Sequence, residues 1–89
     1  MEVKLIQLID MEDTKYDKLF IVDKVKYEAV KNDLDKLKTA EFESEIPQNE
    51  LIPRSVAEEY VYGEISWYKC LLQIFDNMAI GIDSVKYFA

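Results

Sequence analysis

Two short apolar runs near the start of the chain predict a β-hairpin. The runs are VKLIQLID, residues 3–10, and KLFIVD, residues 18–23, and both are rich in Val, Ile, Leu and Phe. Residues of these types favour extended strands, and the polar stretch between the runs is short enough to connect two antiparallel strands. The stretch contains no glycine, so the type of turn stays open.

The segment that follows has the apolar period of an amphipathic helix. Asp23 is a suitable N-cap residue, and Tyr27, Val30, Leu34 and Leu37 come after it at spacings of three, four and three positions. At 100° per residue these four side chains fall within an arc of about 80°. So narrow a stripe buries too little surface to offset the backbone entropy of the helix, so we expect it to pack against the hairpin.

A connector and a second helical segment are predicted after residue 38. Residues 39–53 contain two prolines and no helical period, which indicates an extended chain. Ser55 and Glu58 then match a capping box, which predicts that a helix begins there. Between Val56 and Ala79 the apolar side chains occupy about 220° of the helical wheel, far more than the stripe of just over 100° that one sheet would cover. We expect this segment to be covered from two sides.

Two glycines modify the second helical segment. Gly63 costs about 1 kcal/mol relative to alanine inside a helix, so it either breaks the helix in two or allows another backbone to approach closely. Gly81 is expected to end the helix, and residues 84–88, SVKYF, have the composition of a last strand. The patterns together predict one α+β domain over residues 1–89, in which an antiparallel sheet and two helices form two layers.

Negative charge is concentrated in one part of the chain. The net charge of the 89 residues is −7, and residues 41–64 carry seven carboxylates against Arg54 alone. This balance disfavours direct binding to nucleic acids or anionic membranes, because both need clusters of Lys and Arg. We expect instead a protein partner with a basic surface.

The sequence also carries signals of cellular location. No apolar run approaches the roughly 20 residues that cross a bilayer, and the first residues lack the pattern of a secretory signal. Cys70 is the single cysteine and cannot form an internal disulfide, which fits a reducing compartment. We therefore expect a soluble protein of the cytoplasm.

The residue types on which many catalytic sites depend are scarce. The chain has no histidine, which removes Ser–His–Asp and Cys–His nucleophiles and imidazole metal ligands. One cysteine is too few for a zinc site of Cys and His, and neither a phosphate-binding glycine loop nor an EF-hand pattern is present. We expect no enzymatic activity, no cofactor and no metal.

Two titratable residues near the apolar arc each have two interpretations. Glu64 is the one acid inside the arc, where it would be a desolvated acid catalyst unless it reaches solvent or pairs with Lys69 or Arg54. Cys70 lies at the rim of the arc and is either a small core residue or a reactive thiol. We prefer the non-catalytic interpretation of both.

Three glutamates alternate with other residues at the start of the acidic segment. In an extended chain Glu41, Glu43 and Glu45 lie on one face, about 6.6–6.8 Å apart, which is about two phosphate steps of a nucleic-acid strand. Such a row can occupy basic sites meant for phosphates, with Phe42 and Ile46 anchored in the core. The alternative is a solvated connector without a role, because unit charges 7 Å apart in water repel by only about 0.6 kcal/mol.

The first functional hypothesis is therefore a small acidic inhibitor, a nucleic-acid mimic that blocks the basic groove of a nucleic-acid-handling protein. The expected contacts are Glu41, Glu43, Glu45, Glu50, Glu58, Glu59 and Tyr62. In size, acidity and lack of catalytic residues the chain resembles the short inhibitors that bacteriophages use against host defence, including anti-CRISPR and anti-restriction proteins. The resemblance is one of type, without a shared motif, and it implies no role for any single residue.

The second hypothesis is a homodimer or a small subunit of an assembly. The wide apolar arc around Tyr60, Trp67 and Phe75 would then pack against another chain, and the carboxylates would keep the protein soluble. Aromatic residues at helical spacing usually belong to a core, but Tyr and Trp are also enriched at interface hot spots. Salt distinguishes the hypotheses, because a complex held by charge weakens steeply as salt rises and an apolar interface responds little.

Overall fold

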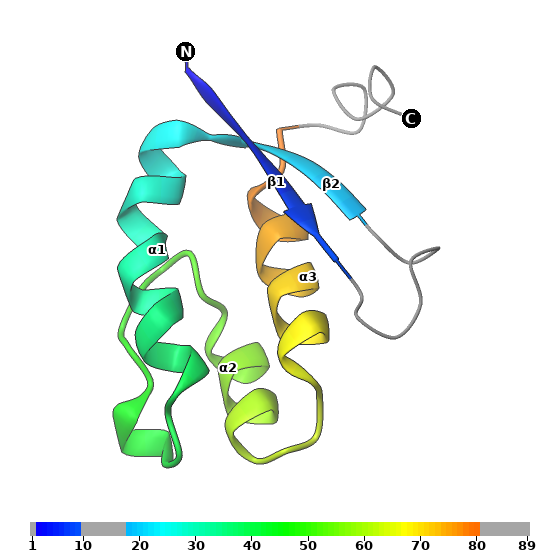
Figure 1. Ribbon diagram of the computed structural model, residues 1–89. Helices are drawn as coiled ribbons and strands as arrows, with labels where there is room; N and C mark the ends of the chain where they lie inside the picture. The colour runs from blue at the N-terminus through cyan, green and yellow to red at the C-terminus, as the bar shows by residue number, and fades with distance from the viewer. Residues whose placement is uncertain (1, 10–17, 81–89) are drawn as a thin grey trace.

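The computed structural model describes residues 2–9 and 18–80, and these form a small α+β fold of a two-stranded antiparallel sheet and helices (Figure 1). The α+β class is as the sequence predicts. The described residues contain three α-helices where two were expected, and a short 3-10 turn, η2, lies in the connector. The elements are β1 (Val3–Leu8), β2 (Lys18–Asp23), α1 (Lys24–Lys38), η2 (Glu43–Glu45), α2 (Arg54–Val61) and α3 (Trp67–Met78).

The hairpin is confirmed, with Val3 opposite Asp23 and Leu8 opposite Lys18. Since successive side chains of a strand point to opposite faces, Ile6 and Leu8 share one face with their neighbours on β2, and this face packs on the helices. The chain returns to the sheet after α3, where Val22 and Ala79 form a bridge. The helix stop at Gly81 and the last strand over 84–88 lie outside the described residues.

The first helix begins where its sequence predicts. Asp23 is the N-cap, and its carboxylate accepts a hydrogen bond of 2.8 Å from the N–H of Val25. Val30, Leu34 and Leu37 are buried, and Tyr27 is half-buried, so the apolar stripe faces the core as expected.

The second helical segment is broken in two, which settles the two alternatives for Gly63. Gly63 has a φ of +79°, a left-handed conformation that side chains disfavour, and a Cβ added there would meet nothing within 4 Å. The glycine is therefore needed for the turn after α2 and not for close packing. Ser66 then starts α3 as its N-cap by accepting a hydrogen bond from the N–H of Lys69.

The prediction of a capping box at Ser55 is wrong, because Ser55 is not the N-cap of α2. The helix α2 begins one residue earlier, at Arg54, with Pro53 at the N-cap position and no side-chain cap. Ser55 is thus already inside the first turn, where it cannot serve as the N-cap. Glu58 accepts instead from Arg54, whose Nε lies 3.1 Å from its carboxylate.

Helix α3 occupies the centre of the fold, and partners cover it from more than one side. Its buried residues Cys70, Ile74 and Met78 belong to the same core as Phe20 and Val22 of the sheet. At the other end of α3, the ring of Trp67 lies 4.9 Å from the ring of Tyr60 on α2. The connector completes the core with the buried residues Ile46 and Ile52.

Candidate protein-interaction surface

The acidic connector is not the extended row that its alternating pattern predicts. Residues 43–45 form η2, in which the N–H of Glu45 donates to the carbonyl of Phe42 at 2.9 Å. The carboxylate of Glu45 turns back and accepts from the N–H groups of Glu41 and Phe42, both at 3.0 Å. A 3-10 turn has about three residues per turn, so alternate residues leave the common face of a strand. The phosphate-like spacing of the three glutamates is lost.

The two apolar anchors expected in this stretch have different positions. Ile46 is buried, as predicted, whereas Phe42 is 65% exposed. The prediction for Phe42 is wrong because the turn removes the alternation that would have put Phe42 and Ile46 on one inward face. An exposed phenylalanine therefore stands among the glutamates of the connector.

A cluster of hydrogen bonds joins the connector to α2. The hydroxyl of Tyr62 donates to the carboxylate of Glu43 at 2.6 Å. Arg54 lies between Glu43, with Nη2 at 3.6 Å from Oε1, and Glu58, with Nε at 3.1 Å. The hydrogen bond to Glu43 raises the pKa of Tyr62 above its ordinary value, because the nearby carboxylate favours the protonated phenol. Glu43 of the connector thus shares one site with Arg54, Glu58 and Tyr62, which follow one another four residues apart along α2 and its C-cap.

This site lies at the end of the molecule away from the hairpin, where η2, the end of α1 and the turn after α2 come together (Figure 1). We call it the acidic end. It consists of Glu41, Phe42, Glu43, Glu45, Arg54, Glu58, Tyr62 and Glu64. Phe42 and Tyr62 are both strongly exposed there, and Arg54 is the one cation of the set.

The expected contact residues are brought together in part. Glu41, Glu43, Glu45, Glu58 and Tyr62 belong to the acidic end. Glu50 follows Asn49, whose amide is bonded to the carbonyl of Ala29 and the carboxylate of Asp33 on α1, and it shares the lining of an open pocket with Arg54. Glu59 is half-buried and lies about 100° around α2 from Glu58.

The two titratable candidates near the apolar arc have ordinary surroundings. Glu64 is exposed in the turn between α2 and α3, so the continuous wheel that put it inside the arc was wrong. Cys70 is fully buried, and burial raises the pKa of its thiol to about 11. The thiol therefore stays protonated at neutral pH, as expected of a core residue.

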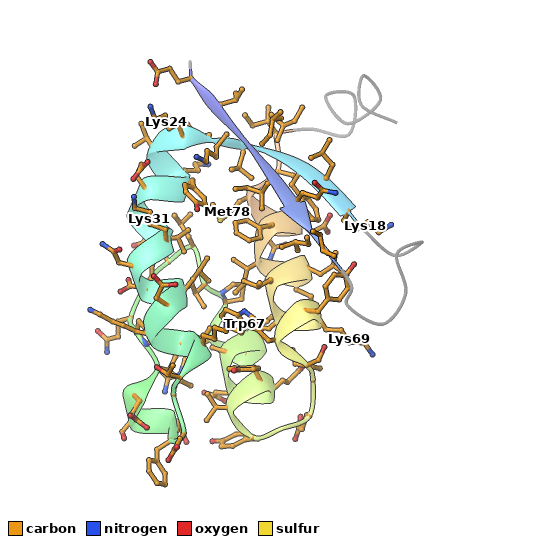
Figure 2. The ribbon with its side chains drawn as sticks, viewed as in Figure 1. Lys18, Lys24, Lys31, Trp67, Lys69 and Met78 are labelled. Atoms are coloured by element: carbon orange, nitrogen blue, oxygen red, sulfur yellow. The ribbon has the colours of Figure 1, made fainter. Side chains whose placement is uncertain are left out.

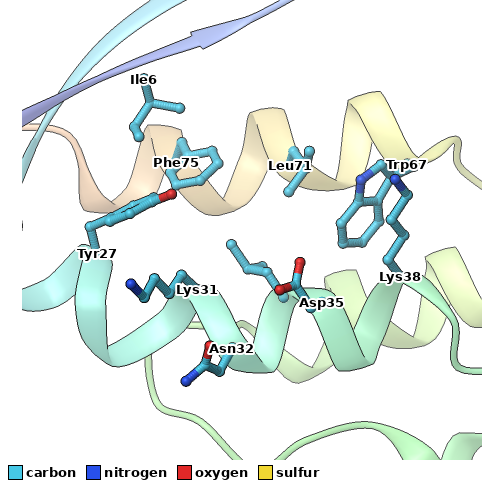
Figure 3. A pocket seen from close by; sticks show the side chains of 10 residues that line it. Ile6, Tyr27, Lys31, Asn32, Asp35, Lys38, Trp67, Leu71 and Phe75 are labelled. Atoms are coloured by element: carbon cyan, nitrogen blue, oxygen red, sulfur yellow. The ribbon is translucent and has the colours of Figure 1, made fainter.

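The sequence pattern also missed a groove. An open pocket of about 490 Å³ lies between α1 and α3, with Leu71, Phe75 and Trp67 on the side of α3 (Figure 3). Lys31, Asp35 and Lys38 line the side of α1, so the rim carries charges of both signs. Within residues 2–9 and 18–80 no group of acids and cysteine is placed to hold a metal ion.

Two residues at the acidic end escaped the sequence analysis as site residues. Phe42 was assigned to the core, and no local pattern shows which apolar side chain of a connector stays outside. Arg54 was not predicted to pair with Glu58, although the spacing of four residues on a helix is a signal for that contact. Its second contact, with Glu43, depends on how the connector folds back.

Comparison with known proteins gives no relative. No family model, curated protein or solved structure matches this chain significantly. In the part of the chain that the structure describes, none of the helices combines the length and apolar character needed to cross a membrane.

Proposed function

We propose that this protein is a small acidic inhibitor that binds a basic groove of a nucleic-acid-handling protein through its acidic end. The observation that carries the proposal is the exposed Phe42, flanked by Glu41 and Glu43 and held on a turn that Glu45 caps. Interfaces commonly place an aromatic residue at their centre and polar groups around it. Here the polar groups are mostly carboxylates, which select a basic partner.

The distribution of charge also supports binding through the acidic end. Outside residues 41–64 the described part of the chain carries eight lysines and six carboxylates, whereas residues 41–64 have seven carboxylates and one arginine. Figure 2 shows Lys18, Lys24 and Lys31 on the hairpin and the near half of α1, away from the acidic end. The acidic end would attract a basic partner most strongly, although Lys36 and Lys38 in the last turn of α1 lie beside it.

The turn changes how such an inhibitor would act. The glutamates do not follow the spacing of phosphates. The acidic end would therefore cover a basic groove as one compact surface, with Phe42 at its centre and carboxylates around it. Dimerisation through the apolar arc has less support, since Cys70, Ile74, Phe75 and Met78 are already buried within the chain.

The test is affinity capture from host and target-cell lysates, with elution by excess duplex DNA or RNA. Wild type should retain a nucleic-acid-binding protein, and either nucleic acid should displace it. Phe42→Ala and Glu41→Lys should lose this partner, because both change exposed side chains at the centre of the surface. Val25→Ala and Asp76→Lys are the matched controls, since they make the same kinds of change at exposed positions outside the acidic end.

The proposal fails if all four variants retain the same partner as wild type. It also fails if nucleic acid does not displace the captured protein, because the acidic end would then not occupy a nucleic-acid groove. Circular dichroism of each variant shows whether a lost partner reflects a lost fold.

A further inference from the structure

Within residues 2–9 and 18–80 no strand pairs with the outer edge of β1, and this edge lies at the end of the molecule opposite to the acidic end (Figure 1). The N–H of Lys24 donates to the carbonyl of Glu2 at 3.1 Å, which fixes the alternation of hydrogen bonds along β1. The N–H and C=O groups of Lys4, Ile6 and Leu8 therefore point toward β2, and those of Val3, Leu5 and Gln7 point outward. Among the described residues only β2 pairs with β1.

The other edge of the sheet is occupied. Ile21 accepts a hydrogen bond of 2.9 Å from the N–H of Ile80, and Val22 forms a bridge with Ala79. The hydrogen bond to Ile21 fits the alternation of backbone directions in the hairpin. Val22 directs its N–H and C=O toward Lys4, so the N–H and C=O of Ile21 point to the other side. Of the two edges, β1 alone offers free backbone groups within residues 2–9 and 18–80.

The side chains beside the outer edge of β1 are apolar and exposed. Val3, Leu5 and Ile9 are 50%, 51% and 54% exposed on the face turned away from the helices. Between Val3 and Ile9 this face carries no charge, whereas edge strands of monomers are usually protected by charges, prolines or bulges. The one charge on β1, Lys4, is on the other face, with its Nζ 5.5 Å from the ring centre of Tyr27.

We propose that β1 pairs antiparallel with β1 of a second copy of this chain, which makes a four-stranded sheet around a two-fold axis. In the favoured register Val3 faces Ile9 of the second copy and Leu5 faces its Gln7. Each residue of β1 with outward N–H and C=O groups then faces such a residue of the second copy, as an antiparallel ladder requires. The axis passes between the two Ile6 residues.

Lys4 disfavours one alternative register. A register in which Val3 faces Leu5 of the second copy would place the two Lys4 residues directly opposite each other, which is unfavourable. In the favoured register Lys4 faces Leu8, and the two lysines lie about 14 Å apart along the strands. The strand is thus self-complementary, as a two-fold interface must be.

The charge distribution favours a second copy as the occupant. Pairing at β1 keeps the two acidic ends on the far sides of the dimer, so the carboxylates of residues 41–64 do not oppose association. It also extends a two-stranded sheet, which has little stability by itself, to four strands. This inference does not rest on the proposed inhibitor function, since it uses the opposite end of the molecule.

The test is sedimentation velocity of the full chain over a range of concentrations. Wild type should dimerise, and Leu5→Pro should weaken dimerisation by about tenfold or more, because proline removes an outward N–H that β2 does not use. Leu5→Lys should have the same effect and serves if proline disturbs the hairpin. Val25→Lys is the matched control and should dimerise like wild type, since Val25 is an exposed apolar residue on α1.

Cross-linking tests the register. The double variant Val3→Cys with Ile9→Cys should form a disulfide-linked dimer under mild oxidation, while Leu5→Cys alone should cross-link poorly. The proposal is overturned if wild type sediments as a monomer throughout, or if both Leu5 variants dimerise as wild type does. A dimer lost in Trp67→Ala and kept in both Leu5 variants would place the interface on α3 and would equally overturn it.

Discussion

The hairpin end and the acidic end of this molecule use their charges differently. Near the hairpin, opposite charges pair locally, with Lys24 3.1 Å from Glu2 and Lys31 2.8 Å from Glu28. At the acidic end a single arginine serves both Glu43 and Glu58. Surface ion pairs of either kind contribute little stability, so the excess of carboxylates at one end is not explained by folding.

The two ends also differ in the kinds of group that they expose. In the part of the chain that the structure describes, the hairpin end leaves outward backbone groups of β1 without a strand beside them, next to the exposed aliphatic side chains of Val3, Leu5 and Ile9, which suits another strand. The acidic end exposes Phe42 and Tyr62 among carboxylates, which suits a basic surface. The two proposals assign two separate interaction surfaces to one core, and variants that affect the core and each surface separately can test this division.

The largest effect is expected in the core that supports both ends. Ile74 is fully buried on α3, so Ile74→Ala should lower the free energy of unfolding by about 2–5 kcal/mol. Phe42→Ala, by contrast, should change it by less than about 0.5 kcal/mol, since the ring is exposed. Urea denaturation followed by circular dichroism measures both. Equal losses from the two variants would mean that Phe42 is packed and that the acidic end belongs to the core.

A smaller effect is expected at the turn that separates α2 from α3. Gly63→Ala should cost about 1–2 kcal/mol, because alanine must adopt a φ of +79° although nothing obstructs its Cβ. Gly63→Asn is the matched variant and should cost less, since asparagine tolerates the left-handed region better. If Gly63→Ala were instead stabilising, α2 and α3 would form one continuous helix, and Tyr62 would not lie beside Glu43.

The difference between the ends also explains which parts of the fold could be predicted from the sequence. The hairpin and α1 depend on local signals, namely alternating apolar residues, the Asp23 cap and the spacing of Val30, Leu34 and Leu37. The start of α2 could not be read in this way, because a capping pattern at Ser55 was present while Pro53 had already set the helix start. A local motif is informative only where the backbone places it at the helix end.

The acidic end was predicted in composition but not in shape. Its carboxylates form one segment of the sequence, and the structure adds a hydrogen bond between Tyr62 and Glu43 that no pattern predicted. The extended row was wrong because Glu45 caps the N–H groups of Glu41 and Phe42, a contact that competes with the strand. The exposure of Phe42 follows from this turn, and a pattern of alternation could not show it.

The smallest effect is expected in the titration of Tyr62, which tests whether the acidic end keeps its arrangement in solution. Its pKa is raised above the ordinary 10.0, mainly by the hydrogen bond to Glu43. A raised pKa means that the stabilising contribution is complete below pH 10 and is lost as the pH rises through the folded-state value. Glu43→Gln should lower the pKa of Tyr62 toward 10.0, because the amide accepts a hydrogen bond without a negative charge.

The measurement is the ultraviolet absorbance of phenolate, taken as the difference between each protein and the same protein with Tyr62→Phe, since the chain has six tyrosines. Glu2→Gln is the control, because it removes a carboxylate at the hairpin end and should leave the titration of Tyr62 unchanged. An identical Tyr62 curve in wild type and Glu43→Gln would show that the two side chains are not bonded in solution. The acidic end would then lack the contact that fixes Tyr62 beside the connector, and Phe42 alone would remain as its aromatic centre.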